Sequence, residues 1–191
     1  MKNLKKFVAL LLAGVMAMVM LTACGADTTT TTQKEEIIRT QLGKRTEATG
    51  LCDKDGMVEN DSELYAETAK LLDKRIQLEA NSNMLGYLAV KFNTKGIEER
   101  EEYVTVTLSA SYKTAGYVAK LITSITNEFG KIEATNSNVK FDGTWAKVAV
   151  VVRTNEKGDS YAAIAIKMKN IAYKGKSVMT SQSFLPRRAP A

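Results

Sequence analysis

Four stretches of the chain carry the polar and apolar pattern of β-strands. In Tyr103–Leu108 the valines and the leucine fall on one face and the threonines on the other. The other predicted strands are Leu85–Phe92, Trp145–Arg153 and Tyr161–Met168. Val148–Val152 is apolar at every position, which predicts burial on both faces and helices on both sides of the sheet.

Three other stretches repeat apolar residues at helical spacing, and we predict helices at Gln33–Thr46, at about 60–83 and at Thr114–Phe129. The second opens with Asn, Asp, Ser and Glu, whose side chains can cap free backbone N–H groups. Gly130 is predicted to end the third. The expected core-facing stripes are Leu64, Ala69, Leu72 and Ile76 in the second helix and Val118, Leu121, Ile122, Ile125 and Phe129 in the third.

The N-terminus has the pattern of an export signal, with three early lysines followed by the apolar run Phe7–Leu21. The run ends in Leu21-Thr22-Ala23-Cys24, which resembles the lipobox of bacterial lipoproteins. That resemblance implies that the Cys24 thiol is diacylated and that the mature protein starts at Cys24. An uncleaved helical anchor is the alternative, but the run is shorter than the ~20 residues of a membrane span.

These signals divide the chain into four parts. We predict a lipoprotein signal peptide at 1–23, a threonine-rich tether at 24–33, one α+β domain at 34–170 and a C-terminal strand or tail at 171–191. Removal of the signal leaves 191 − 23 = 168 residues, which is enough for one hydrophobic core without disulfide bonds or bound metals. The net charge falls from +6 to +3 with the loss of three signal lysines. The sequence contains no basic run with interleaved aromatic residues, so we do not expect it to bind nucleic acid.

The chain contains no histidine, which removes the usual general base near neutral pH and the commonest metal ligand. Triads that need histidine are excluded. The two aspartates of Cys52–Gly56 do not match the spacing of a calcium loop, so this segment is predicted to be a turn. We predict no cofactor, no metal and no catalytic residue.

Two features are candidates for a histidine-free enzyme. If Cys24 is acylated, Cys52 has no disulfide partner, so it is either a reactive thiol or a small apolar side chain under a loop. The charge run Glu98–Glu102 offers a carboxylate pair, but a general acid needs an apolar pocket. The run is therefore interpreted as a solvated loop.

The order of pieces resembles the CAP family, the SCP/PR-1-like secreted domains common in Gram-positive bacteria. The resemblance covers about residues 35–168 and rests on pattern and spacing, with Leu85–Phe92 fitting poorly. It implies a three-layer α-β-α sandwich with a mixed or antiparallel central sheet. The segments that carry it are 42–45, 49–51, 61–64, 112–115, 147–151, 156–158 and the strand from Tyr161.

The departures from that family concern its cleft, where many members carry two histidines and two acidic residues. In the register of the resemblance, an acidic position of the family falls on Val106 and a histidine position falls near Glu128. One carboxylate does not make a site. The resemblance therefore implies that the scaffold is kept and the cleft chemistry is lost.

The sequence predicts a lipid-anchored, non-catalytic binding or structural module on the extracytoplasmic face of the cell membrane. Its partners are the membrane itself through Cys24, and a cell-wall polymer, a small apolar ligand or an envelope protein. One alternative is a small hydrolase or thiol-dependent enzyme that uses Cys52 or a carboxylate. Another is a ligand-capturing lipoprotein of a transport system, although such proteins usually have two lobes.

Overall fold

The computed structural model describes residues 30–81, 90–98, 100–112 and 117–175. Several predictions fall outside this part of the chain: the signal peptide, Cys24, most of the tether, residues 85–89 of a predicted strand, Thr114 and the tail from residue 176. The described residues hold the whole predicted α+β region apart from those gaps.

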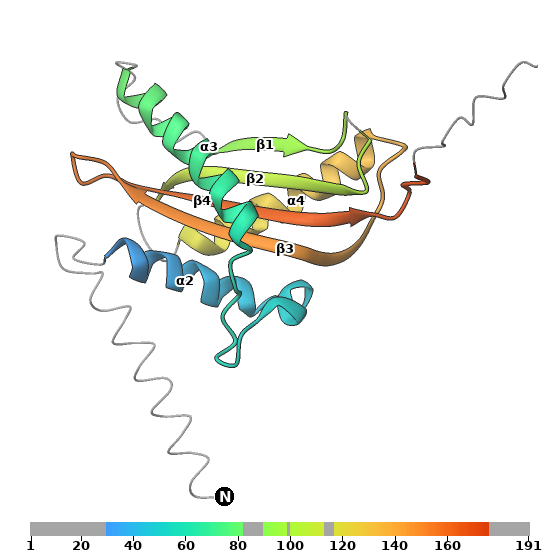
Figure 1. Cartoon of the computed structure of the whole chain (residues 1–191), viewed down its shortest axis with the longest axis horizontal. Helices are drawn as coiled ribbons and strands as arrows, with labels where there is room; N and C mark the ends of the chain where they lie inside the picture. Colours follow the sequence, from blue (N-terminus) through green and yellow to red (C-terminus); the bar gives the residue numbers. More distant parts are fainter. Residues whose placement is uncertain (1–29, 82–89, 99, 113–116, 176–191) are drawn as a thin grey trace, which may run out of the picture.

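Four antiparallel strands form one sheet in the order β1-β2-β4-β3 (Figure 1). The predicted α+β class, with an antiparallel sheet packed against helices, is confirmed. Three predicted strands lie inside observed ones, and the fourth is described only from Val90, just before β1. The strands are β1 (Lys91–Lys95), β2 (Tyr103–Tyr112), β3 (Phe141–Thr154) and β4 (Ser160–Asn170).

Different helices cover the two faces of this sheet (Figure 1). The helices are α2 (Thr31–Gly43), the 3-10 helix η1 (Thr46–Leu51), α3 (Ser62–Asn81) and α4 (Val118–Thr135). The side chains of α2, η1 and α4 form the main core with one face, which we call the α4 face. The opposite side, the α3 face, packs against α3.

Side-chain size differs between the two faces. On the α4 face β4 contributes large residues such as Ile164 and Ile166, which are fully buried. On the α3 face the strands contribute Ala149, Ala163 and Ala165, which meet Leu64 or Leu72 of α3. Small residues let the helix approach the sheet closely. Because β3 is buried on both faces, the prediction drawn from the apolar run 148–152 is confirmed.

The outer edge of β3 is occupied by polar groups of preceding segments. Asn60 pairs with Val150 in both directions: its amide oxygen accepts from the backbone N–H at 2.7 Å, and its amide nitrogen donates to the carbonyl at 3.4 Å. The Asp61 N–H donates to the carbonyl of Val148, and the Glu35 carboxylate accepts from the N–H of Val152. These contacts satisfy backbone groups that an edge strand otherwise leaves open.

Replacing Asn60 by alanine is expected to lower the free energy of unfolding by about 1–3 kcal/mol, because it leaves backbone groups of the buried Val150 unsatisfied. Urea denaturation followed by circular dichroism measures the loss. Asn127→Ala is the matched control, since Asn127 is exposed on α4. Equal stability of the two variants would show that the amide pairing contributes nothing.

Three helix ends differ from the prediction, and one of them is the end of α2, which lies at Gly43 instead of Thr46. α4 passes through Gly130 and ends at Thr135, because Ile132 extends the buried stripe by one further turn. α2 begins at Thr31, inside the predicted tether, since Thr30 and Gln33 form a reciprocal capping box at its start. α2 therefore includes residues 31–33 of the predicted tether. Of the predicted C-terminal strand or tail, the structure describes residues 171–175, which hold a turn at 171–172 and no strand.

Candidate functional site

A polar groove lies on the α3 face, beside the N-terminal half of α3. Residues from α3, from the β1–β2 connection and from all four strands line it. Only one of them is apolar, so the groove presents charges and hydroxyl groups to a ligand. The lining residues are Asp61, Glu63, Leu64, Glu67, Lys95, Glu101, Thr105, Lys147 and Lys167.

The floor of the groove is a single row across the sheet. The strand register places Lys95 opposite Thr105, Thr105 opposite Lys167, and Lys167 opposite Lys147. The neighbouring row toward the middle of α3 contains Thr107 and two alanines, which lets the helix pack there. The side chains are small in the row that packs against α3 and long and charged in the next row. The row of lysines therefore lies beyond the part of the sheet on which α3 packs.

Two of the three floor lysines are held by carboxylates of α3 and its cap. Lys147 Nζ lies 2.9 Å from Asp61 and 3.7 Å from Glu63, and Lys95 Nζ lies 3.3 Å from Glu67. The hydrogen bond to Asp61 raises the pKa of Lys147. Burial acts to raise the pKa of Asp61, but hydrogen bonds from the Leu64 N–H and from Lys147 outweigh it and lower that pKa.

Asp61 therefore has two roles. Its carboxylate pairs with the charge of Lys147, and it caps α3 by accepting a hydrogen bond from the Leu64 N–H at 2.9 Å. Its lowered pKa contributes stability that is present above the unfolded pKa and is lost as pH falls through the folded pKa. Asp61→Asn keeps a capping oxygen and removes only the charge, so it should destabilise the protein at pH 7 and match the wild type in strong acid.

Asp61→Ala also removes the cap, and it should cost about 0.5–2 kcal/mol. Chemical denaturation of the three proteins between pH 2 and pH 7 measures both effects. A constant difference between wild type and Asp61→Asn over the whole range would contradict the assigned role of the charge.

Lys167 has a different environment. It is half-buried, and its ammonium lies 5.6 Å from the ring centroid of Tyr103. Within the described part of the chain no carboxylate lies within ion-pair distance of it. Lys169, two residues further along β4, instead pairs with Glu102 at 3.2 Å, and this hydrogen bond raises its pKa.

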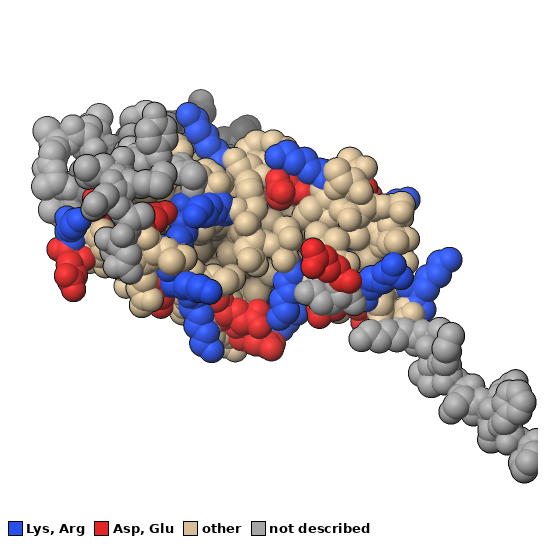
Figure 2. All heavy atoms as spheres, turned by 90° about the horizontal axis from the view of Figure 1, so that it is seen from above, with Lys and Arg blue, Asp and Glu red and all other residues tan. Residues whose placement is uncertain are grey.

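Charges of both signs line the groove and are mixed on the face of the molecule seen in Figure 2. Figure 2, which views the molecule from above Figure 1, shows lysine and arginine side chains interspersed with acidic ones. A face of this kind has no single-sign field to steer a polyanion.

A second polar cluster lies between α2 and the sheet. The buried Lys34 ammonium lies 3.0 Å from the hydroxyl of the buried Ser160 and 5.6 Å from the ring of Tyr112, and Thr154 contacts the same hydroxyl at 3.0 Å. A serine beside a lysine is a nucleophile–base arrangement in some hydrolases. Here both side chains are more than nine-tenths buried, so the cluster anchors α2 and offers no nucleophile to a substrate.

Cys52 lies against the main core and is half-buried. Its thiol hydrogen-bonds to the carbonyl oxygens of Ala48 at 3.3 Å and Gly43 at 3.7 Å. These contacts fit the interpretation as a packed side chain under a loop. The predicted turn after it is confirmed, because the Asp53 carboxylate accepts from the N–H groups of Asp55 and Met57.

The structure does not bring the other predicted site residues together. Val106 is fully buried in β2, and Glu128 lies on α4 in an ion pair with Lys131. Glu101 and Glu102 are exposed, as expected for a solvated connection. In the described ranges no group of three residues of the metal-ligating types (His, Cys, Asp, Glu) is close enough to hold an ion.

No family model, curated protein or solved structure matches this chain. The site must therefore be interpreted from its own geometry. Among the described residues, no helix has the length and apolar character needed to cross a membrane.

Sequence reasoning missed the groove, although one signal was present. In β4 the lysines at 167 and 169 alternate with Ile166 and Met168, and Lys147 comes just before the apolar run of β3. Polar residues at alternate positions indicate an uncovered part of one sheet face. Their convergence depends on the strand register, which the sequence pattern alone does not give.

Proposed function

We propose that this protein is a lipid-anchored envelope module that binds a polar ligand in the groove and catalyses no reaction. The proposal is supported mainly by the groove, where charged side chains from three strands, from α3 and from the β1–β2 connection converge beside the Thr105 hydroxyl of β2. Among the described residues that line it are lysines, carboxylates and one threonine, with Leu64 as the single apolar member. This composition favours a polar ligand over the small apolar one considered from the sequence.

The anchor is inferred from the lipobox pattern that ends at Cys24. Because α2 starts at Thr31 and Thr30 is its cap, at most six residues separate the acylated cysteine from the folded domain. At ~3.3–3.6 Å per residue these reach roughly 20 Å. The first turn of α2 would then lie near the lipid head groups.

We also propose that the fold is a diverged form of the three-layer α-β-α sandwich of the CAP family. The positions of α3 on one face and of α2 and α4 on the other support it. An experimental structure tests this: α3 and α4 superposing on two helices of that family around a shared sheet would support it, and a different strand connection would contradict it.

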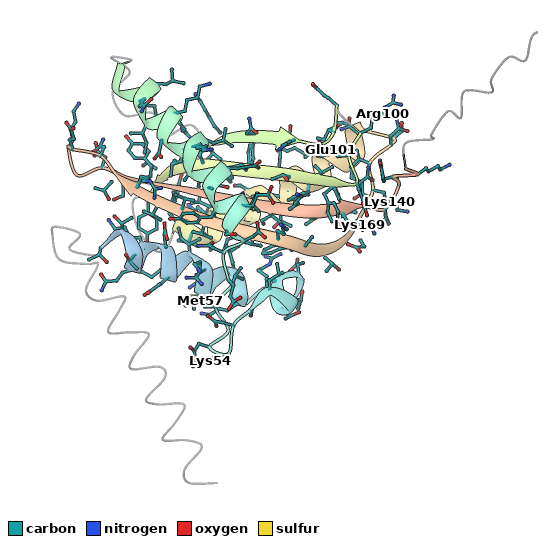
Figure 3. All side chains as sticks on the ribbon, viewed as in Figure 1. Lys54, Met57, Arg100, Glu101, Lys140 and Lys169 are labelled. Carbon is teal, nitrogen blue, oxygen red and sulfur yellow. The ribbon has the colours of Figure 1, made fainter. Side chains whose placement is uncertain are left out.

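The anchor is tested by Cys24→Ala. The wild-type protein should be recovered in the membrane fraction and labelled by a radioactive fatty acid. The variant should carry no label, and it should leave the membrane fraction once its signal peptide is cleaved or removed from the membrane. Lys54→Ala, in the exposed turn shown in Figure 3, is the control and should remain membrane-bound. An unlabelled wild-type protein recovered from the cytosol would contradict the anchor.

The binding role is tested by retention on immobilised envelope material. The purified protein should hold soluble wall fragments or an envelope component above a heat-denatured control, and Lys147→Gln or Lys167→Gln should reduce that retention. Retention that is equal for the folded, denatured and substituted proteins would contradict a binding role for the groove.

A further inference from the structure

Among the described residues, one cation and one anion in the groove form no ion pair. The lining contains three lysines and four carboxylates. Lys147 is held by Asp61 and Glu63, and Lys95 is held by Glu67. Lys167 and Glu101 then remain, and neither forms an ion pair with another residue that the structure describes.

Thr105 adds a hydrogen-bonding group beside Lys167, its direct partner in the register of β2 and β4. Thr105 is only 9% exposed and lines the groove. Within the described ranges its hydroxyl has no hydrogen-bond partner. Because Thr105 lines the groove, its hydroxyl is accessible to water or to a ligand. A hydroxyl and an ammonium side by side are donors suited to a carboxylate.

Lys167 also opposes Lys147 directly across β4 and β3. Like charges directly opposite each other destabilise a sheet. Asp61, which pairs with Lys147, also attracts Lys167 and offsets part of this repulsion. Such local conflicts are expected where a residue serves a ligand rather than the fold.

Glu101 supplies the opposite charge on the other wall. It lies in the connection between β1 and β2, and Figure 3 shows it at the end of the sheet where Lys169 also lies. Its backbone N–H is fixed by the carbonyl of Gly96 at 3.0 Å, which holds the connection beside the groove. The exposed carboxylate is an acceptor for an ammonium group.

We propose that the groove binds a zwitterionic ligand of the amino-acid type, either a free amino acid or the end of a short peptide. The ligand's carboxylate contacts Lys167 and Thr105, and its ammonium contacts Glu101. This inference rests on the proposed function, because it takes the groove as the binding surface and adds the chemical class of the ligand. Both contacts are ionic and partly exposed, so binding should weaken as salt is added.

The test is isothermal titration calorimetry of the full lipoprotein in detergent at low ionic strength. The probes are glycine, glycylglycine, N-acetyl-glycylglycine, which lacks the ammonium, and glycylglycine amide, which lacks the carboxylate. Glycine or glycylglycine should bind, and each blocked dipeptide should bind at least tenfold more weakly than glycylglycine. Comparison of glycine with glycylglycine distinguishes a free amino acid from a peptide end.

Two substitutions assign the charges. Lys167→Gln should weaken glycylglycine at least tenfold and leave the amide unchanged, whereas Glu101→Gln should weaken glycylglycine and leave the N-acetyl form unchanged. Thr105→Val should weaken every carboxylate-bearing probe. Lys157→Gln, in the exposed β3–β4 turn, is the control and should bind like the wild type. Thermal unfolding checks that each variant is folded.

The proposal is overturned if no probe gives heat, if a blocked dipeptide binds as tightly as glycylglycine, or if Lys167→Gln binds like the wild type. These outcomes are independent of the tests above. Calorimetry in detergent needs no membrane attachment, and fatty-acid labelling needs no groove chemistry. An amino-acid-binding protein recovered without lipid would contradict the anchor alone.

Discussion

Replacing Ile164 by alanine is expected to lower the free energy of unfolding by about 2–5 kcal/mol. Ile164 is fully buried in β4, one of the two central strands, and it faces the main core. Its partners in the register are Leu108 of β2 and Val150 of β3, which are also fully buried. The truncation leaves a cavity between three strands and the helices above them.

The measurement is guanidinium denaturation, with Ile171→Ala as the control. Ile171 is 48% exposed just after β4 and should cost much less. Ile164→Val removes a single methylene and should cost about 0.5–1.5 kcal/mol. A graded series in this order supports the assigned core, and equal losses at positions 164 and 171 would contradict it.

Gly96→Ala is expected to destabilise the protein by about 2–4 kcal/mol, from left-handed strain and overpacking together. Gly96 has φ +92°, a conformation that side chains other than glycine rarely adopt, and a Cβ atom there would lie 2.2 Å from the Tyr103 carbonyl oxygen. Relief of that contact requires movement of the start of β2, beside the groove.

Gly130→Ala is the matched control in the other direction. Gly130 lies inside α4, and an added Cβ meets no atom within 4 Å. Alanine there should stabilise the protein by about 0.5–1 kcal/mol, because glycine in a helix interior costs more backbone entropy. Thermal melts of the two variants give shifts of opposite sign if the backbone assignments are right. A stabilising Gly96→Ala would contradict the assigned turn.

The parts of the fold that local chemistry specifies could be predicted from the sequence. The apolar run 148–152 of β3 indicated burial on both faces, and the residues before α3 indicated its cap, which Asp61 provides. The prediction that α4 ends at Gly130 was wrong because a glycine inside a helix costs only ~1 kcal/mol. Burial of Ile132 outweighs that cost, so the helix continues.

The groove could not be predicted, because it depends on contacts between distant segments. Lys95, Lys147 and Lys167 share a row only because β4 pairs between β2 and β3, while the chain passes through α4 and β3 before it reaches β4. A shift of one residue in either pairing would send a lysine to the opposite face. The sequence indicated strands with polar positions, but not which positions meet.

The polar groups along the outer edge of β3 have a consequence for proteins crowded on one bilayer. If α2 and the segment around Asn60 detach, the amides and carbonyls of Val148, Val150 and Val152 lose their partners. A bare valine-rich strand is then a template for growth of an intermolecular β-structure, and tethering raises its local concentration. Protection of this strand from self-association would thus depend on α2, which follows the tether, and on the segment around Asn60.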